Sequence, residues 1–87
     1  MKLNVELVFT EMGDYYVAVP VGDNKKNMVI RLNKTGMDIC KYLAEGLSEE
    51  EIIQTIMEKY EVSDEKIVEN SVEKVIKQLK SEKLLEG

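Results

Sequence analysis

The chain has 87 residues, of which 12 are Lys or Arg and 17 are Asp or Glu, so its net charge is −5. This acidic balance argues against general affinity for nucleic acid or anionic membranes, because such affinity comes mainly from basic residues that neutralise phosphate. Hydrophobic residues make up 44% and charged residues 33% of the chain. These fractions predict one folded domain over residues 1–87 rather than a disordered segment.

The sequence carries no sign of a membrane or secretory segment. No apolar run approaches the roughly 18 residues that a membrane-spanning helix needs, and charged residues near the N-terminus come too early for a secretory signal. The single cysteine, Cys40, cannot form a disulfide within the chain, which is typical of a reducing compartment. We therefore expect a cytoplasmic protein that has no membrane partner.

The first third of the chain alternates apolar and polar residues with a period of two, which predicts β-strands. Strands are expected over residues 3–12 and 15–21, joined by a tight turn at Gly13-Asp14. A polar loop, residues 22–27, leads to a third strand over 28–32. The side chains expected on one face of each strand are Leu3, Val5, Leu7 and Phe9, then Tyr15, Val17, Val19 and Val21, then Met28, Ile30 and Leu32. Three consecutive strands with short connections predict an antiparallel meander.

After Asn33 the apolar period changes from two to 3.6, which indicates helices. The expected helices cover residues 34–45, 49–60 and 64–82. Asn33 is the expected cap of the first helix, Gly46 should end it in the left-handed conformation, and Ser48 and Glu51 form a capping box for the second. The sequence therefore predicts an α+β fold, in which a three-stranded antiparallel sheet is followed by three helices. This inventory is winged helix-turn-helix-like.

The third helix has a regular apolar stripe that should face the core. The stripe consists of Val68, Val72, Val75 and Leu79. Ile67 and Ile76 flank this stripe on opposite sides, and Leu84 and Leu85 form a short apolar tail that should fold back onto the core.

Residues that carry out chemistry are scarce in this sequence. Histidine is absent, which removes the commonest general base and the commonest metal ligand. Cys40 has no nearby Cys or His and fits a small buried hydrophobic residue. The five glycines are scattered at turns and form no phosphate-binding loop. We therefore expect a binding module rather than an enzyme, with no metal and no cofactor.

Two surfaces are candidates for binding. The strand over residues 28–32 lies at an edge of the predicted sheet, and an extended peptide can add to such an edge as another strand, beside an apolar groove along the third helix. The apolar residues of this strand also fit a core strand whose edge is covered by other parts of the chain. Spacing alone favours this covered strand over a peptide-binding edge. The third helix is also a candidate DNA-recognition helix, but its acidic residues, such as Glu69 and Glu73, would face phosphate unfavourably.

Two segments carry a resemblance to a known family: Arg31-Leu32-Asn33-Lys34-Thr35-Gly36, and the corner Glu45-Gly46-Leu47-Ser48-Glu49-Glu50-Glu51. With the order of hairpin, strand and helices, they resemble the family of the pyrroloquinoline quinone biosynthesis protein D over nearly the whole chain. This resemblance implies a small winged-helix-like domain that recognises ribosomally made, post-translationally modified peptides. Such domains hold the leader segment of a precursor peptide as an added strand and deliver it to a modifying enzyme, often a radical S-adenosylmethionine enzyme.

The resemblance places peptide binding on the third strand and the near side of the third helix. The implied peptide-binding residues are Met28, Val29, Ile30, Arg31 and Leu32 on the strand, and Ile67, Ser71, Lys74, Val75 and Gln78 on the helix. Lys74, with Arg31 and Lys66 nearby, would supply positive charge, so we expect a leader with an acidic residue between apolar anchors. The remaining partner expectations are no nucleic acid, and a monomer or a weak homodimer that uses an exposed strand edge.

Overall fold

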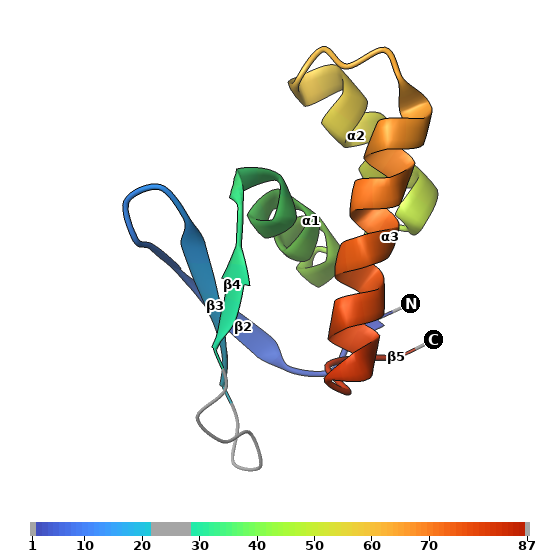
Figure 1. Cartoon of the computed structure of the whole chain (residues 1–87). Coiled ribbons are helices and arrows are strands. Elements are labelled where there is room, and N and C mark those ends of the chain that lie inside the picture. Colours follow the sequence, from blue (N-terminus) through green and yellow to red (C-terminus); the bar gives the residue numbers. More distant parts are fainter. Residues whose placement is uncertain (1, 22–28, 87) are drawn as a thin grey trace.

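The computed structural model describes residues 2–21 and 29–86. A three-stranded antiparallel sheet is formed by β2 (Glu6–Glu11), β3 (Tyr16–Val21) and β4 (Ile30–Leu32), in the order β2-β3-β4. Figure 1 shows this sheet on one side of the molecule, with helix α1 between it and helix α3. The predicted α+β fold, a sheet followed by three helices, is confirmed. The predicted loop over residues 22–27 and Met28 lie outside the described residues.

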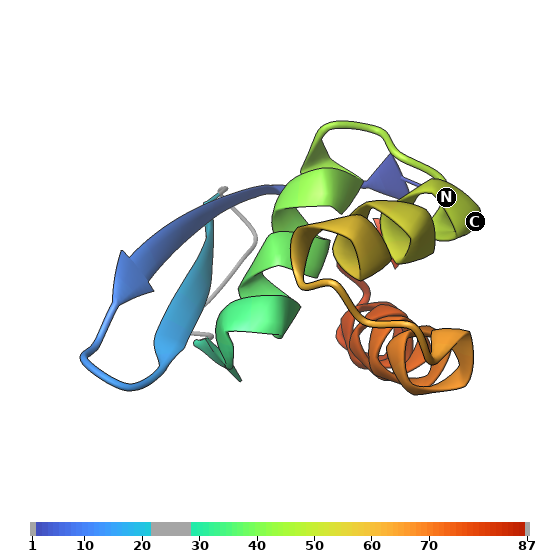
Figure 2. The ribbon, with the colours of Figure 1, turned by 90° about the horizontal axis from the view of Figure 1, so that it is seen from above.

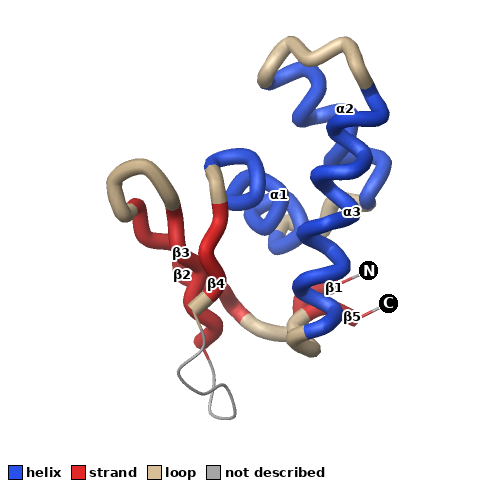
Figure 3. Tube along the Cα trace, in the orientation of Figure 1, coloured by secondary structure: helices blue, strands red, loops and turns tan. Residues whose placement is uncertain are grey.

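The predicted first strand, residues 3–12, is wrong as one strand, because the chain bends at Asn4 and Val5. Strand β1 (Lys2–Leu3) lies before the bend and pairs with β5 (Leu85–Glu86) at the other end of the chain. The Asn4 backbone N–H also donates to the Leu84 carbonyl, at 3.0 Å. The C-terminal tail therefore does fold back onto the core, and its pairing with β1 brings the two ends of the chain together (Figure 3).

The register of β2 and β3 decides which face of β3 packs on the helices. Leu7 pairs with Pro20 and Phe9 with Ala18, and directly paired residues point to the same face of a sheet. Because Leu7 faces the core, Ala18 and Pro20 do so too, and both are buried. The predicted face of Tyr15, Val17, Val19 and Val21 is therefore the outer one, on which Val19 and Val21 are exposed.

The three helices follow the predicted segments to within a residue or so at each end. Their bounds are Lys34–Ala44 for α1, Glu49–Lys59 for α2 and Glu65–Ser81 for α3. Ser48 and Glu51 form the predicted capping box at the start of α2, with both reciprocal hydrogen bonds present. Gly46, after the end of α1, has a φ of 92°, a conformation that favours glycine.

Helix α1 supplies much of the core because it packs between the sheet and α3 (Figure 2). Its buried apolar residues Ile39, Cys40 and Leu43 belong to the same core cluster as the predicted stripe of α3, and Leu79 of that stripe is fully buried. Among the described residues, no helix is long and apolar enough to cross a membrane.

Candidate functional site: the groove between strand β4 and helix α3

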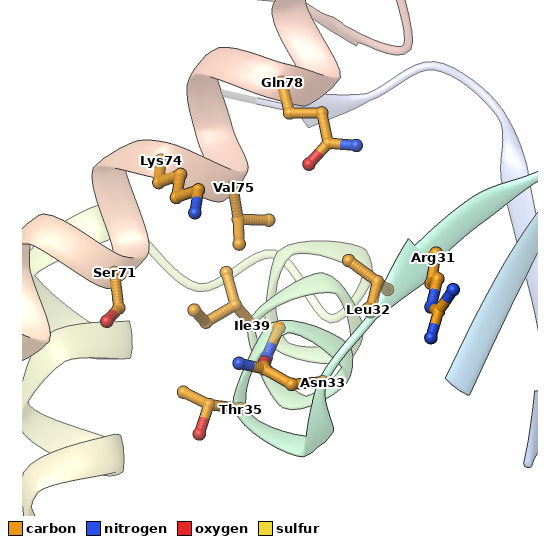
Figure 4. A pocket seen from close by; sticks show the side chains of 10 residues that line it. Arg31, Leu32, Asn33, Thr35, Ile39, Ser71, Lys74, Val75 and Gln78 are labelled. Carbon is orange, nitrogen blue, oxygen red and sulfur yellow. The ribbon is translucent and has the colours of Figure 1, made fainter. Parts of the chain in front are cut away.

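A pocket of about 250 Å³ lies between β4 and α3, and the first turns of α1 form its base (Figure 4). Three separate elements therefore supply its walls. The lining residues are Arg31, Leu32, Asn33, Thr35, Gly36, Ile39, Ser71, Lys74, Val75 and Gln78. We call this pocket the β4–α3 groove.

Strand β4 gives the groove a free sheet edge. In the described part of the chain, β4 pairs with β3 on one side, through Ile30 with Ala18 and Leu32 with Tyr16, and with no strand on the other. Side chains alternate along a strand, so Ile30 and Leu32 are buried. An edge of this kind presents unpaired backbone N–H and C=O groups. The edge that the sequence predicted is therefore present.

Helix α3 forms the opposite wall with one of its faces. Ser71, Lys74, Val75 and Gln78 are spaced by three or four residues, so they share a face of the helix. Val75 is 9% exposed and joins the apolar surface, whereas Lys74 and Gln78 are exposed at the rim. This wall thus combines an apolar floor with polar groups above it.

The first turn of α1 contributes residues that the predicted site lacks. Asn33 caps this helix by accepting a hydrogen bond of 2.7 Å from the Gly36 N–H. A Cβ at Gly36 would come within 3.2 Å of both the Asn33 Oδ1 and the Leu32 Cδ2, so the close approach of strand and helix favours glycine. Thr35 and Ile39 of α1 also line the groove. The sequence feature that could have predicted this is the position of Asn33, which directly follows β4, so that α1 begins beside the strand edge.

Not every predicted site residue lies in the groove. Six of the ten line it: Arg31, Leu32, Ser71, Lys74, Val75 and Gln78. Ile30 is buried in the core, Val29 is exposed, and Met28 lies outside the described residues. Ile67 is 59% exposed and is absent from the groove lining, so its part in peptide binding stays a prediction. Val75, which does line the groove, stands about two turns farther along α3.

Two cations, Arg31 and Lys74, line the groove. The Arg31 guanidinium lies 4.0 Å from the centre of the Tyr15 ring, and Figure 4 shows its side chain pointing away from Lys74 and Val75. Lys66 pairs with Glu69 at 3.6 Å. Arg31 lines the groove together with Lys74, whereas Lys66 is absent from the lining, so the contribution of both cations to the charge beside Lys74 stays a prediction.

A second hollow, of about 430 Å³, lies on the opposite side of α3, against the start of α2. Its lining residues are Glu49, Glu50, Ile53, Gln54, Glu65, Glu69 and Glu73. We call it the acidic hollow. Its glutamates stand in the first turns of α2 and on α3, and the first-turn carboxylates stabilise the positive ends of the helix dipoles.

Asp38 is a buried charged residue that sequence reasoning missed. It is 4% exposed on α1 and bonds with three groups: Lys34 at 3.4 Å, Lys59 at 3.0 Å and the Tyr60 hydroxyl, which donates to its carboxylate. Burial by itself would raise the pKa of this carboxyl, but the hydrogen bonds from Tyr60 and Lys59 and the charge of Lys34 outweigh it, so the pKa lies below its ordinary value. Asp38 thereby ties α1 to the end of α2.

Groups for metal binding or nucleophilic chemistry are not gathered in the described part of the chain. No group of three or more Cys, Asp or Glu side chains there could hold a metal ion. Cys40 is fully buried, and this burial raises the pKa of its thiol to about 12, so it stays protonated at neutral pH.

The chain matches a family of known proteins and one solved structure in particular. The model of the family described as coenzyme PQQ synthesis protein D (PqqD) matches residues 11–85. The structure of "TbiB1 in Complex with the TbiA(beta) Leader Peptide" superposes with a TM-score of 0.76 at 28% sequence identity, over 100% of this chain and 96% of TbiB1. A search of curated protein sequences finds no match. Since the family model spans most of the chain and all elements of the groove, this chain belongs to the PqqD family.

Proposed function

We propose that this chain binds the leader segment of a ribosomally made precursor peptide as an added strand along β4. The observation that carries this proposal is the free edge of β4 beside the β4–α3 groove. Strand addition uses main-chain hydrogen bonds for affinity and pockets for alternate side chains for selectivity. The TbiB1 structure, which is similar over the whole chain, holds a leader peptide and supports this choice of ligand.

The dimensions of the groove suit peptide side chains. Its volume of about 250 Å³ is below the roughly 300–1,000 Å³ of typical small-molecule pockets. The floor is apolar, formed by Leu32, Ile39 and Val75, and the rim carries the amides of Asn33 and Gln78. An added strand would place every second side chain toward this floor. Of the predicted residues, Arg31, Leu32, Ser71, Lys74, Val75 and Gln78 would meet the peptide, and Val29 would flank its path.

The chain would then present the peptide to a separate modifying enzyme, which we propose to be a radical S-adenosylmethionine enzyme, and would carry out no chemistry itself. The groove lining contains no carboxylate, thiol or imidazole that could act as a general acid or base. Membership of the PqqD family supports a role in the modification of a peptide.

We also propose that the free chain is a monomer or a weak homodimer, which sedimentation velocity would test.

The alternative function, a winged-helix regulator that binds DNA, has no observation in its favour. In that mode, the recognition helix places its N-terminal residues in the major groove. Here that end of α3 contributes Glu65, Glu69 and Glu73 to the acidic hollow, which also contains Glu49 and Glu50. DNA phosphates would be repelled by this surface.

Chemical-shift mapping tests the proposal. We would titrate the ¹⁵N-labelled chain with a synthetic peptide that covers the leader of a ribosomally made precursor, and in parallel with random duplex DNA. We expect the peptide to shift the amides of residues 29–32 and of α3 from Ser71 to Gln78, while DNA shifts none. Peptide-induced shifts confined to α2 or β2 would contradict strand addition on β4.

A further inference from the structure

We propose that Lys74 selects the peptide by charge: it pairs with an acidic side chain that stands two positions from an apolar side chain seated on the groove floor. This inference rests on the proposed peptide binding along β4 and adds the chemical class of the recognised segment. It concerns a cation that projects from α3 into the β4–α3 groove, as Figure 4 shows.

Lys74 has no carboxylate neighbour along its own helix. Residues three and four positions away on a helix are the ones that contact a side chain, and for Lys74 these are Asn70, Ser71, Lys77 and Gln78. The ion pairs of the described residues involve Lys34, Lys59 and Lys66, and Lys74 is not among them. Its ammonium is therefore available to a ligand.

The groove around Lys74 is the exception on an acidic molecule. The chain has a net charge of −5, yet the groove lining contains no Asp or Glu. Of the two cations in that lining, Arg31 already contacts the Tyr15 ring. A basic peptide would be repelled by Lys74, and a neutral one would leave it unpaired, so an acidic residue is the complementary partner.

The spacing of the acidic residue follows from strand geometry. Residues i and i+2 of an added strand point to the same face, about 7 Å apart, whereas residue i+1 points away. The apolar floor includes Val75, the neighbour of Lys74 in sequence. A peptide that seats an apolar side chain over Val75 can reach Lys74 with a carboxylate only from a position on that same face. We therefore expect the pattern of an apolar residue and Asp or Glu separated by one residue.

A selection experiment tests this pattern. A library of displayed random 12-residue peptides would be selected against the wild-type chain, against Lys74→Glu, and against Lys77→Glu. Lys77 is exposed on α3 outside the groove lining, so Lys77→Glu matches the change in net charge. We expect the wild-type and Lys77→Glu selections to enrich acidic residues two positions from apolar ones, and the Lys74→Glu selection to enrich Lys or Arg at that position.

The affinity of one selected peptide then gives a quantitative check. Replacing its acidic residue with the corresponding amide should weaken binding to the wild-type chain roughly twofold to fivefold, as expected for loss of an ion pair at an exposed rim. The same replacement should strengthen binding to Lys74→Glu, because it removes the repulsion between two carboxylates.

The outcomes separate the two proposals. Peptides that bind at residues 29–32 without acidic enrichment, or that keep it with Lys74→Glu, would overturn the charge selection and leave strand addition intact. If no peptide is enriched, or if the enriched peptides shift amides away from β4 and α3, strand addition itself is wrong.

Discussion

The β4–α3 groove and the acidic hollow lie on opposite sides of the same helix and have opposite character. The groove is lined by apolar residues, amides and Lys74, with no carboxylate, whereas five of the seven residues of the hollow are glutamates. The groove borders a free strand edge, which can form directional main-chain hydrogen bonds. The hollow borders two helices, whose interior backbone groups bond within each helix and whose first turns are capped by the side chains of Ser48 and Asp64. A hollow thus becomes a candidate peptide site when unpaired backbone and complementary side chains coincide.

The largest effect is expected when a carboxylate is placed on the floor of the groove, which would make the groove resemble the acidic hollow. We expect Val75→Asp to weaken peptide binding by several kcal/mol, because a charge there would be buried without a partner. Isothermal titration with a peptide that binds the wild-type chain measures this loss. Lys77→Ala, outside the groove, serves as the control and should change affinity less than twofold.

Val75 also belongs to the core, at 9% exposure, so its substitution could unfold the chain. Gln78→Glu avoids this difficulty, since Gln78 is exposed on the rim and lies four residues after Lys74. The new carboxylate should pair with Lys74 along the helix and should also repel the carboxylate of an acidic peptide. Together these effects should weaken binding about tenfold at unchanged melting temperature. Unchanged affinity in both variants would exclude the groove as the binding site.

The second prediction concerns Asp38, which ties α1, the base of the groove, to α2, a wall of the hollow. We expect Asp38→Asn to lower the free energy of unfolding by about 1–3 kcal/mol, because charged hydrogen bonds with Lys59 and Tyr60 are lost. Urea unfolding at pH 7 measures this difference. A loss below about 0.5 kcal/mol would show that the cluster does not stabilise the helix pair.

The lowered pKa of Asp38 also predicts how the free energy of unfolding changes with pH. The pKa of Asp38 is lower in the folded chain than its ordinary value, so its ionised form favours folding. This contribution is complete at pH values above the unfolded pKa, near 4, and is lost as the pH falls through the folded pKa. The difference in stability between the wild type and Asp38→Asn should therefore shrink on acidification below about pH 4, as urea titrations across this range would show. A difference that grows there would contradict the assigned shift.

The smallest effect is expected on the other side of α3. Glu73→Gln removes a charge from an exposed position of the acidic hollow and should change the free energy of unfolding by less than about 0.5 kcal/mol. Peptide affinity should stay within twofold of the wild type in a titration. A larger loss of affinity would show that the peptide extends to the hollow, and the two sides of α3 would then belong to one site.

Much of the fold and part of the groove were predictable because they depend on neighbours in sequence. Helix starts follow from local caps such as Asn33 and Ser48, and the face of α3 that reaches the groove follows from helical spacing around Val75. The edge position of β4 follows from the order of short connections. Spacing alone favoured a covered edge, and the family resemblance made strand addition beside α3 the leading interpretation.

Tertiary structure decided the features that depend on which residues meet across the fold. Pairing with the distant β5 splits the first strand at Asn4, and the register with β2 turns Ala18, not Val19, toward the core. Arg31 lines the groove with its guanidinium against the Tyr15 ring, whereas Lys74 projects from α3 into the groove. In the sequence, Asp38 has no feature that distinguishes it from an exposed helix residue. In the fold it is buried, and the end of α2 supplies two hydrogen-bond donors to it, Lys59 and Tyr60. Sequence periodicity by itself defines the faces of each element, whereas long-range packing selects which face is covered and which charges are paired.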